Sequence, residues 1–170
     1  MSVQISRVAK RPGVYRLETE QWLPRSKPDV FEFFADAFQQ EAITPPWLNF
    51  QVITPAPIVM QPGLTIDYRL KLHGWPVRWR SEISVWEPCE RFVDQQLIGP
   101  YRLWHHEHTF YHQKQGGQNE STLVRDVVHY AVTGGPLIHW LMVKRDLVTI
   151  FNDRQKRMQE LLGEPANATL

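Results

Sequence analysis

The amino-acid sequence predicts an α+β fold in which a curved antiparallel sheet of about seven strands wraps around one long C-terminal helix. The first indication is a series of segments between residues 14 and 132 in which apolar and polar side chains alternate, as they do in strands with one buried face. The second is that short turns such as Pro62-Gly63 and His73-Gly74 join these segments, which makes neighbouring strands antiparallel. The third is an amphipathic segment of about 26 residues that ends at Gly163, enough for a helix of roughly 40 Å.

The N-terminal part of the chain is predicted to hold one strand and one or two short helices. Val14–Leu23 alternates between apolar and charged residues and therefore predicts a half-buried strand. Ser26 is placed to cap a helix that runs to about Gln40, because Pro28 is tolerated in a first turn and apolar residues then recur at helical spacing. The prolines within residues 44–48 allow only a short second helix.

Six further strands are predicted before the C-terminal helix, at residues 50–54, 64–72, 77–85, 91–98, 101–112 and 122–132. Gly99-Pro100 separates two of them, and residues 116–119 form a turn before the last. In the C-terminal helix, the inward side is predicted from steps of three, four or seven residues to consist of Leu137, Trp140, Leu141, Val148, Phe151, Met158 and Leu162. We expect one domain over residues 14–163, an N-terminal extension over residues 1–13 and a flexible tail over residues 164–170.

The composition excludes several classes of partner. The 19 basic and 18 acidic residues leave no net field that would attract nucleic acid or an anionic membrane. No N-terminal segment has the apolar core of a signal peptide, and the longest apolar run is too short to span a bilayer. We therefore expect a cytoplasmic protein without stable membrane insertion. Aromatic residues make up 12% of the chain, a surplus that often lines a pocket for an apolar ligand.

Five segments spanning most of the chain carry a resemblance to a known family: V-F-E-F-F-A-D-A-F (30–38), I-T-P-P-W-L-N-F (43–50), I-D-Y-R-L (66–70), F-V-D-Q-Q-L-I-G-P-Y-R-L-W-H-H-E-H-T-F (92–110) and D-V-V-H-Y (126–130). They resemble the START-like superfamily, also called SRPBCC, which includes polyketide cyclase-like proteins, coenzyme Q-binding proteins and birch-pollen allergens. Stand-alone bacterial SRPBCC proteins are more similar still, as is the domain that precedes some epimerase-like short-chain dehydrogenases. The resemblance implies a helix-grip fold with a hydrophobic ligand cavity, but no particular reaction.

The same resemblance suggests a short-chain dehydrogenase-like protein as a candidate partner. The chain has no Gly-rich dinucleotide fingerprint of its own, so any oxidoreductase link would act through a separate protein. We expect no cofactor.

Four polar residues are the candidate functional centre, because they share strand faces with apolar and aromatic neighbours: Asp94, His106, His108 and Asp126. The spacing of the two histidines suits two ligands of one metal, with either aspartate as a third. A histidine beside an aspartate in an apolar cavity also suits acid–base catalysis, as in a cyclase or dehydratase. The third interpretation is a hydrogen-bonded network that anchors the sheet or orients a ligand, and we favour it over both metal binding and catalysis.

We expect the ligand contacts to come from this centre together with the aromatic residues of the inner face. The predicted contacts are Tyr68, Trp79, Asp94, Gln96, Trp104, His106, His108, Phe110, Asp126 and Tyr130. The basic residues of the C-terminal helix, Arg154 among them, alternate with acids and are predicted to form a solvated face. The function that follows is binding or transport of a small hydrophobic molecule such as a lipid, quinone or polyketide-like compound.

Overall fold

The computed structural model describes residues 3–114 and 120–163. The elements, in chain order, are β1 (Gln4–Arg7), β2 (Val14–Leu23), α1 (Lys27–Ala35), α2 (Gln39–Ile43), the 3₁₀ helix η1 (Pro46–Leu48), β3 (Gln51–Val52), β4 (Thr65–Leu72), β5 (Trp75–Glu87), β6 (Arg91–Ile98), β7 (Tyr101–Lys114), β8 (Glu120–Val132), α3 (Gly135–Ile138), the π-helical turn η2 (His139–Val143) and α4 (Lys144–Leu162). The turn expected at residues 116–119 and the tail expected at residues 164–170 lie outside the described residues. Within the described ranges, no helix combines the length and the apolar character needed to cross a bilayer.

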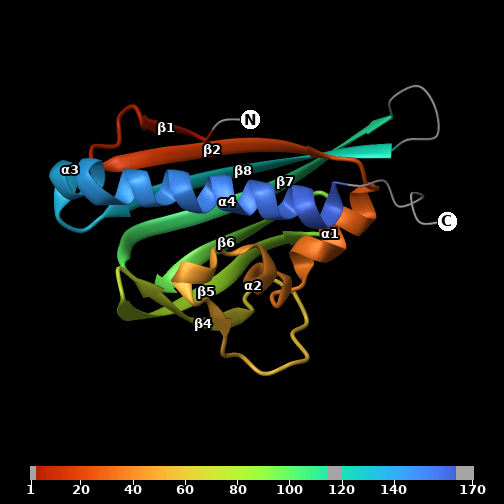
Figure 1. The fold of residues 1–170 in the computed structure, drawn as a ribbon, viewed down its shortest axis with the longest axis horizontal. Coiled ribbons are helices and arrows are strands. Elements are labelled where there is room, and N and C mark those ends of the chain that lie inside the picture. The colour runs from red at the N-terminus through yellow and green to blue at the C-terminus, as the bar shows by residue number, and fades with distance from the viewer. Residues whose placement is uncertain (1–2, 115–119, 164–170) are drawn as a thin grey trace.

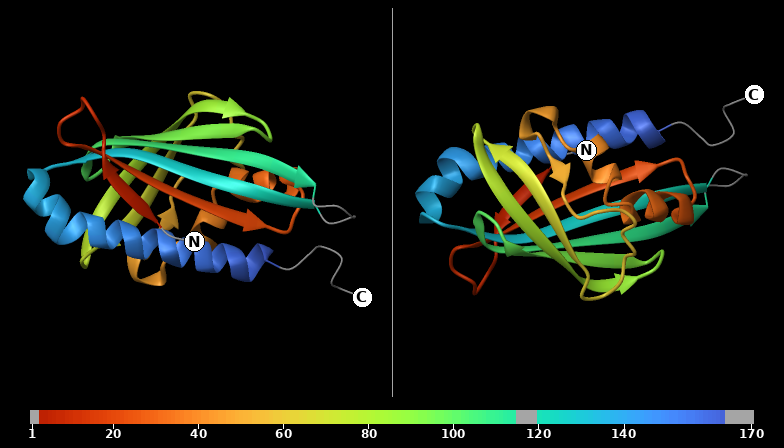
Figure 2. Two further views of the ribbon diagram at one scale, coloured as in Figure 1. Left: turned by 90° about the horizontal axis from the view of Figure 1, so that it is seen from above. Right: turned by 90° about the horizontal axis from the view of Figure 1, so that it is seen from below.

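The strands form one antiparallel sheet in the order β1-β2-β8-β7-β6-β5-β4-β3. The sheet curves around α4, which lies along its inner face (Figures 1 and 2). The predicted helix-grip architecture is therefore confirmed. The strand beyond the expected seven is β1, which pairs with β2 and comes from residues assigned above to an N-terminal extension.

Two predictions for the N-terminal half need correction. The Ser26 side chain caps α1 as predicted, accepting a hydrogen bond from the Asp29 backbone N–H at 3.3 Å. The helix ends at Ala35 and not near Gln40, because Asp36 is extended and its carboxylate accepts from the backbone N–H of Phe38 at 2.8 Å. The strand expected at residues 50–54 is reduced to Gln51–Val52.

The predicted inner face of the C-terminal helix is wrong in its first turns. Leu137 and Trp140 are 65% and 69% exposed, whereas His139 is 5% exposed. Within the π-helical turn, the His139 ring stacks on Tyr15 at 3.4 Å and its Nε2 is 2.9 Å from the Tyr130 hydroxyl. These contacts turn the histidine inward and the large apolar side chains outward. Leu141 is likewise exposed, and in α4 the buried residue is Leu147 where Val148 was predicted, whereas Phe151 and Met158 are buried as predicted.

Two apolar clusters fill the space between the sheet and the helix at different heights along α4. One is centred on Phe31, Phe34, Phe92 and Phe110 and reaches Met158 near the C-terminal end of α4. The other joins residues of β2, β7 and β8 to Leu147 and Phe151. The two clusters leave room between them for the cavity described next.

Candidate functional site

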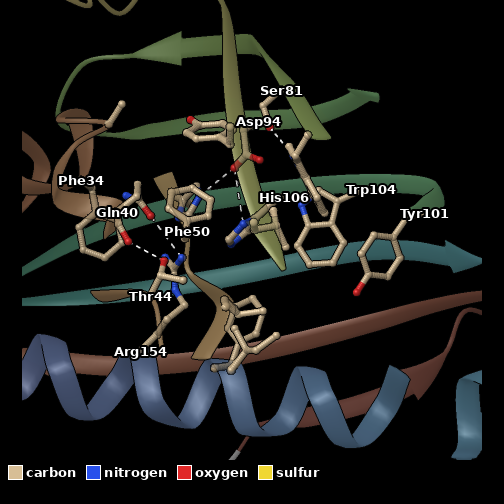
Figure 3. A pocket seen from close by; sticks show the side chains of 18 of the residues that line it. Phe34, Gln40, Thr44, Phe50, Ser81, Asp94, Tyr101, Trp104, His106 and Arg154 are labelled. Carbon is tan, nitrogen blue, oxygen red and sulfur yellow. Dashed lines mark hydrogen bonds and ion pairs between the residues drawn. The ribbon is translucent and has the colours of Figure 1, made fainter. Parts of the chain in front are cut away.

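A cavity of about 170 Å³ lies between the sheet and α4. Its walls are mainly apolar and aromatic and come from three parts of the fold (Figure 3). The sheet supplies Tyr68, Leu70, Leu72, Trp79, Ser81, Ile83, Phe92, Asp94, Tyr101, Trp104, His106 and His108; α4 supplies Leu147, Ile150, Phe151 and Arg154; and the segments between β2 and β4 supply Phe34, Ala37, Gln40, Thr44, Leu48, Phe50 and Met60. This composition is typical of a site for a small ligand that is apolar except at one end.

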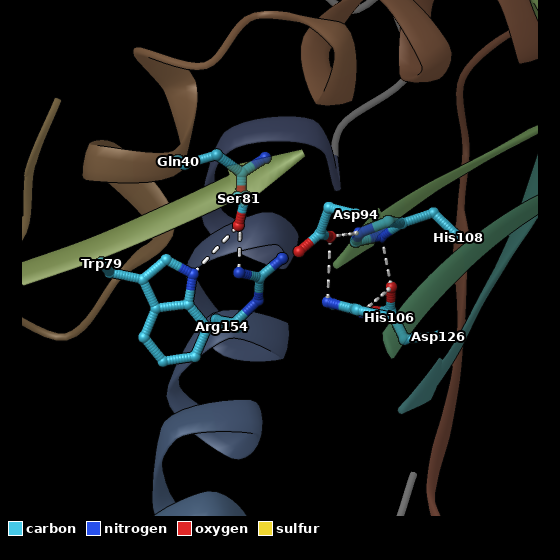
Figure 4. Close-up of polar contacts among 8 residues, drawn as sticks. All are labelled: Gln40, Trp79, Ser81, Asp94, His106, His108, Asp126 and Arg154. Carbon is cyan, nitrogen blue, oxygen red and sulfur yellow. Dashed lines mark hydrogen bonds and ion pairs between the residues drawn. The ribbon is translucent and has the colours of Figure 1, made fainter. Parts of the chain in front are cut away.

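A carboxylate–imidazole network, formed by Asp94, His106, His108 and Asp126, lies at the sheet side of the cavity (Figure 4). His106 Nε2 is 3.1 Å from Asp126 Oδ1, and its Nδ1 is 3.5 Å from Asp94 Oδ2. His108 Nε2 is 3.1 Å from Asp94 Oδ2, and its Nδ1 is 2.6 Å from Asp126 Oδ1, in a close ion contact that is not aligned as a hydrogen bond. Every ring nitrogen of the two histidines therefore faces a carboxylate oxygen.

Strand register brings these four side chains together. Asp94 of β6 lies directly opposite His106 of β7, and His108 lies directly opposite Asp126 of β8. Side chains two residues apart on one strand share a face, so the two imidazoles are neighbours, with ring centroids 3.8 Å apart. The ring of His108 also stacks on Phe92 at 4.2 Å, which fixes its plane.

Mutual contacts decide which members of the network are charged. Burial and the positive charge of His108 both lower the pKa of His106, so its neutral form is favoured. Burial also acts to lower the pKa of His108, but the negative charges and contacts of Asp126 and Asp94 outweigh it and raise that pKa. Burial acts to raise the pKa of both aspartates, but the histidines hold those pKa values below their ordinary value. These shifts favour a network of two carboxylates in which His108 is the histidine that carries the positive charge and His106 is the neutral one.

The same residues fit the geometric requirements of a metal centre. Asp94, His106 and His108 offer ligand atoms that all lie within 4.8 Å of one another. Asp126 would then hold the outer nitrogens of the two imidazoles, as second-sphere carboxylates do at zinc sites. A divalent ion would, however, have to displace the proton between His108 Nε2 and Asp94 Oδ2. Absence of a resident metal stays our prediction.

Arg154 is a second charged group in the cavity, and the sequence analysis placed it wrongly on a solvated face. It extends from α4 towards α2, where its Nη1 donates to Gln40 Oε1 at 3.2 Å (Figures 3 and 4). A signal for its position exists in the sequence, because Leu147, Phe151, Arg154 and Met158 recur in steps of four, three and four residues. The surrounding run of charged residues obscured that spacing.

The residues predicted to contact a ligand divide into two groups. Those that line the cavity are Tyr68, Trp79, Asp94, Trp104, His106 and His108. The other four lie elsewhere: Asp126 is buried behind the histidines, Gln96 bonds the backbone of Tyr101 across the β6–β7 turn, Phe110 packs in the cluster around Phe31, and Tyr130 bonds His139. The alternation of side chains along each strand suggested that all four contact the ligand. Their depth in the fold and their position along the strands separate them from the cavity.

No protein-family model matches the chain, and neither does any curated protein sequence. Solved structures do match it in fold. A Staphylococcus epidermidis protein has a TM-score of 0.65 at 12% identity over 96% of this chain and 94% of its own. The allergen Ara h 8.0201 has 0.61 at 12% over 88% and 98%, and the Zhui aromatase/cyclase from Streptomyces sp. R1128 has 0.61 at 12% over 92% and 99%. At such identities the likeness shows the fold alone.

Proposed function

Because the chain has a START-like, helix-grip fold, we propose that it binds a small, largely apolar molecule in the cavity between the sheet and α4. The observation that carries this proposal is the cavity itself, with apolar and aromatic walls and a few polar groups gathered around Asp94 and Arg154. An apolar cavity of about 150 Å³ can hold a benzene-sized molecule. A volume of about 170 Å³ suits a compact ligand of one or two rings, which would gain dispersion contacts with the aromatic walls.

Binding is favoured over catalysis by the state of the two histidines. A general base needs an unprotonated nitrogen that is directed at the substrate. Here each ring nitrogen of His106 and His108 already faces Asp94 or Asp126. A cyclase- or dehydratase-like enzyme is the second candidate, since His106, His108 and Asp94 do line the cavity. A short-chain dehydrogenase-like partner remains a hypothesis that rests on the sequence resemblance.

Filling the cavity tests the proposal. Ala37 is buried and lines the cavity, so Ala37→Leu would occupy ligand space, whereas Ala42 on α2 is exposed and Ala42→Leu is a matched control. The probe is the neutral two-ring fluorophore 1-aminonaphthalene, followed by its fluorescence. We expect saturable binding to the wild type and the control, and at least about tenfold weaker binding to Ala37→Leu, because one buried CH₂ group contributes about 0.8 kcal/mol and a side chain in the ligand space excludes several such contacts.

Mass spectrometry of an organic extract of the purified protein would complete the test. A bound compound should be present in the wild type and reduced in Ala37→Leu. Equal dye binding by Ala37→Leu and Ala42→Leu, together with no extractable compound, would contradict the proposal.

A further inference from the structure

The guanidinium of Arg154 has one edge that is occupied and one that is not. Its Nη1 donates to Gln40, but Nε and Nη2 have no hydrogen-bond partner among the described residues and no exposed surface. A guanidinium keeps its proton in proteins, so these N–H groups remain donors. A buried donor without an acceptor costs free energy that an incoming acceptor can recover.

The empty edge is the one that other arginines in this chain use to hold oxygen atoms. Arg80 donates from Nε and Nη2 to the two carboxylate oxygens of Asp67, both at 2.8 Å. Arg91 donates from the same two nitrogens to Glu87 at 2.9 and 2.8 Å. In Arg154 the equivalent pair of nitrogens belongs to a residue that lines the cavity. Fork-shaped donation of this kind selects for oxygen acceptors in the plane of the guanidinium.

Charge balance narrows the class of acceptor. Among the described residues, Arg154 forms no ion pair with Asp94 or Asp126, whose direct contacts are with the histidines. The carboxylate–imidazole network nevertheless keeps one unit of negative charge when His106 is neutral and His108 is protonated, and the positive charge of Arg154 interacts with both aspartates. The Nε–Nη2 edge of Arg154 therefore needs acceptor oxygens. An anionic ligand would add a negative charge that no further cation among the described residues of the cavity balances.

Building on the proposed function, we propose that the ligand is a neutral carbonyl compound whose oxygen accepts hydrogen bonds from Nε and Nη2 of Arg154. Its apolar body lies against the aromatic walls, including Phe151, over whose ring the guanidinium sits at 5.7 Å. The carbonyl class covers ketones, quinones, esters and lactones. Asp94, His106 and His108 then form the polar floor beside this head group and do not supply its main contact.

Three naphthalene compounds test the assignment by isothermal titration: 2-acetylnaphthalene, its oxygen-free isostere 2-isopropenylnaphthalene, and the anion 2-naphthoate. A hydrogen bond to a charged donor is worth enough for roughly a tenfold preference. We expect the wild type to bind the ketone about tenfold or more tightly than the isostere, and more tightly than the carboxylate. Arg154→Met should lose the preference for the ketone and bind the isostere unchanged. Arg157→Met should behave as the wild type, because Arg157 is exposed and pairs with Glu160 on the same helix.

A spectroscopic measurement on the wild type keeps the test independent of the folding of Arg154→Met. The carbonyl stretch of bound, ¹³C-labelled 2-acetylnaphthalene should lie at lower frequency than in an apolar solvent, since hydrogen bonds from a cation weaken the C=O bond. Equal binding of ketone and isostere, or an unshifted stretch, would overturn the role of Arg154 and leave the cavity proposal standing. Tightest binding of naphthoate would overturn the neutral class. If none of the three compounds binds, the proposed function fails and this inference with it.

Discussion

The cavity contains two charged regions that differ in how many of their nitrogen atoms have a partner. In the carboxylate–imidazole network, all four ring nitrogens face carboxylate oxygens, and Asp126 is sealed behind the histidines. Arg154 has one hydrogen bond, to Gln40, and an edge of two donors with no hydrogen-bond partner among the described residues. Buried polar groups in proteins are normally satisfied, so the first pattern is what a structural support requires. The second pattern is the one on which the proposed ligand contact rests.

The largest expected effect comes from breaking the network at its most buried member. Asp126→Asn removes the charge that His108 and His106 both face, and it leaves the His108 imidazolium without its closest partner. Breaking a buried ion pair from one side costs about 3–5 kcal/mol. We expect the free energy of unfolding in urea to fall by that amount, against a change below about 0.5 kcal/mol for Asp153→Asn, a carboxylate on α4 with no ion pair among the described residues. A loss below about 1 kcal/mol for Asp126→Asn would mean that the network does not support the fold.

A smaller effect should appear as a dependence of stability on pH. The pKa of His108 is raised in the folded state, so its contribution is complete below the ordinary value of 6.5 and is lost as the pH rises through the folded-state pKa. The lowered pKa of His106 has the opposite sign, and its effect is confined to pH values below 6.5. Above pH 6.5, the free energy of unfolding of the wild type should therefore decrease, by at most about 1.4 kcal/mol per pH unit for one proton.

His108→Gln is the variant that tests this assignment, with unfolding measured in urea between pH 6.5 and 8.5. It should abolish most of the slope, whereas His112→Gln, at an exposed position of the same strand, should keep it. If the slope of the unfolding free energy against pH is unchanged in His108→Gln, the raised pKa does not belong to His108.

The smallest effect is expected at the contact that positions Arg154. Gln40→Leu removes the acceptor of Nη1 and should cost about 1 kcal/mol of stability, the usual net value of one hydrogen bond. Because the guanidinium then loses its fixed orientation, binding of 2-acetylnaphthalene should weaken by a few-fold, with binding of the isopropenyl isostere unaffected. Gln39→Leu, one residue earlier, should change neither quantity. Equal losses for ketone and isostere would indicate that Gln40 shapes the cavity wall and does not orient Arg154.

Local sequence patterns account for most of the fold. The strand β2 has the bounds that alternation predicted, and Ser26 caps α1 as expected. Alternation works because side chains of a strand point to opposite faces whatever the partner strand is. The inner face of the C-terminal helix was harder to predict. Apolar residues such as Leu137 and Trp140 suggested one face, but the tertiary contacts of His139 turn a different face inward.

The candidate site was predictable in its composition but not in its connections. Parity correctly placed Asp94, His106 and His108 on the inner side of the sheet, where they line the cavity. Which aspartate faces which histidine depends on the register between β6, β7 and β8, which involves residues distant in the chain. Arg154 was missed because a charged residue within a charged run predicts a solvated face, and only the packing of α4 on the sheet reveals that its Nε and Nη2 are buried.

The part of the cavity wall that lies outside the sheet and α4 has a consequence for how the protein can change. Leu48, Phe50 and Met60 lie in η1 and in irregular chain, outside the strands that carry Asp94, His106 and His108. Their side chains can be exchanged without changing the strands that carry the network. Evolution or design could therefore widen, narrow or reshape the space for the ligand body at these three positions while the polar head-group contacts are inherited intact.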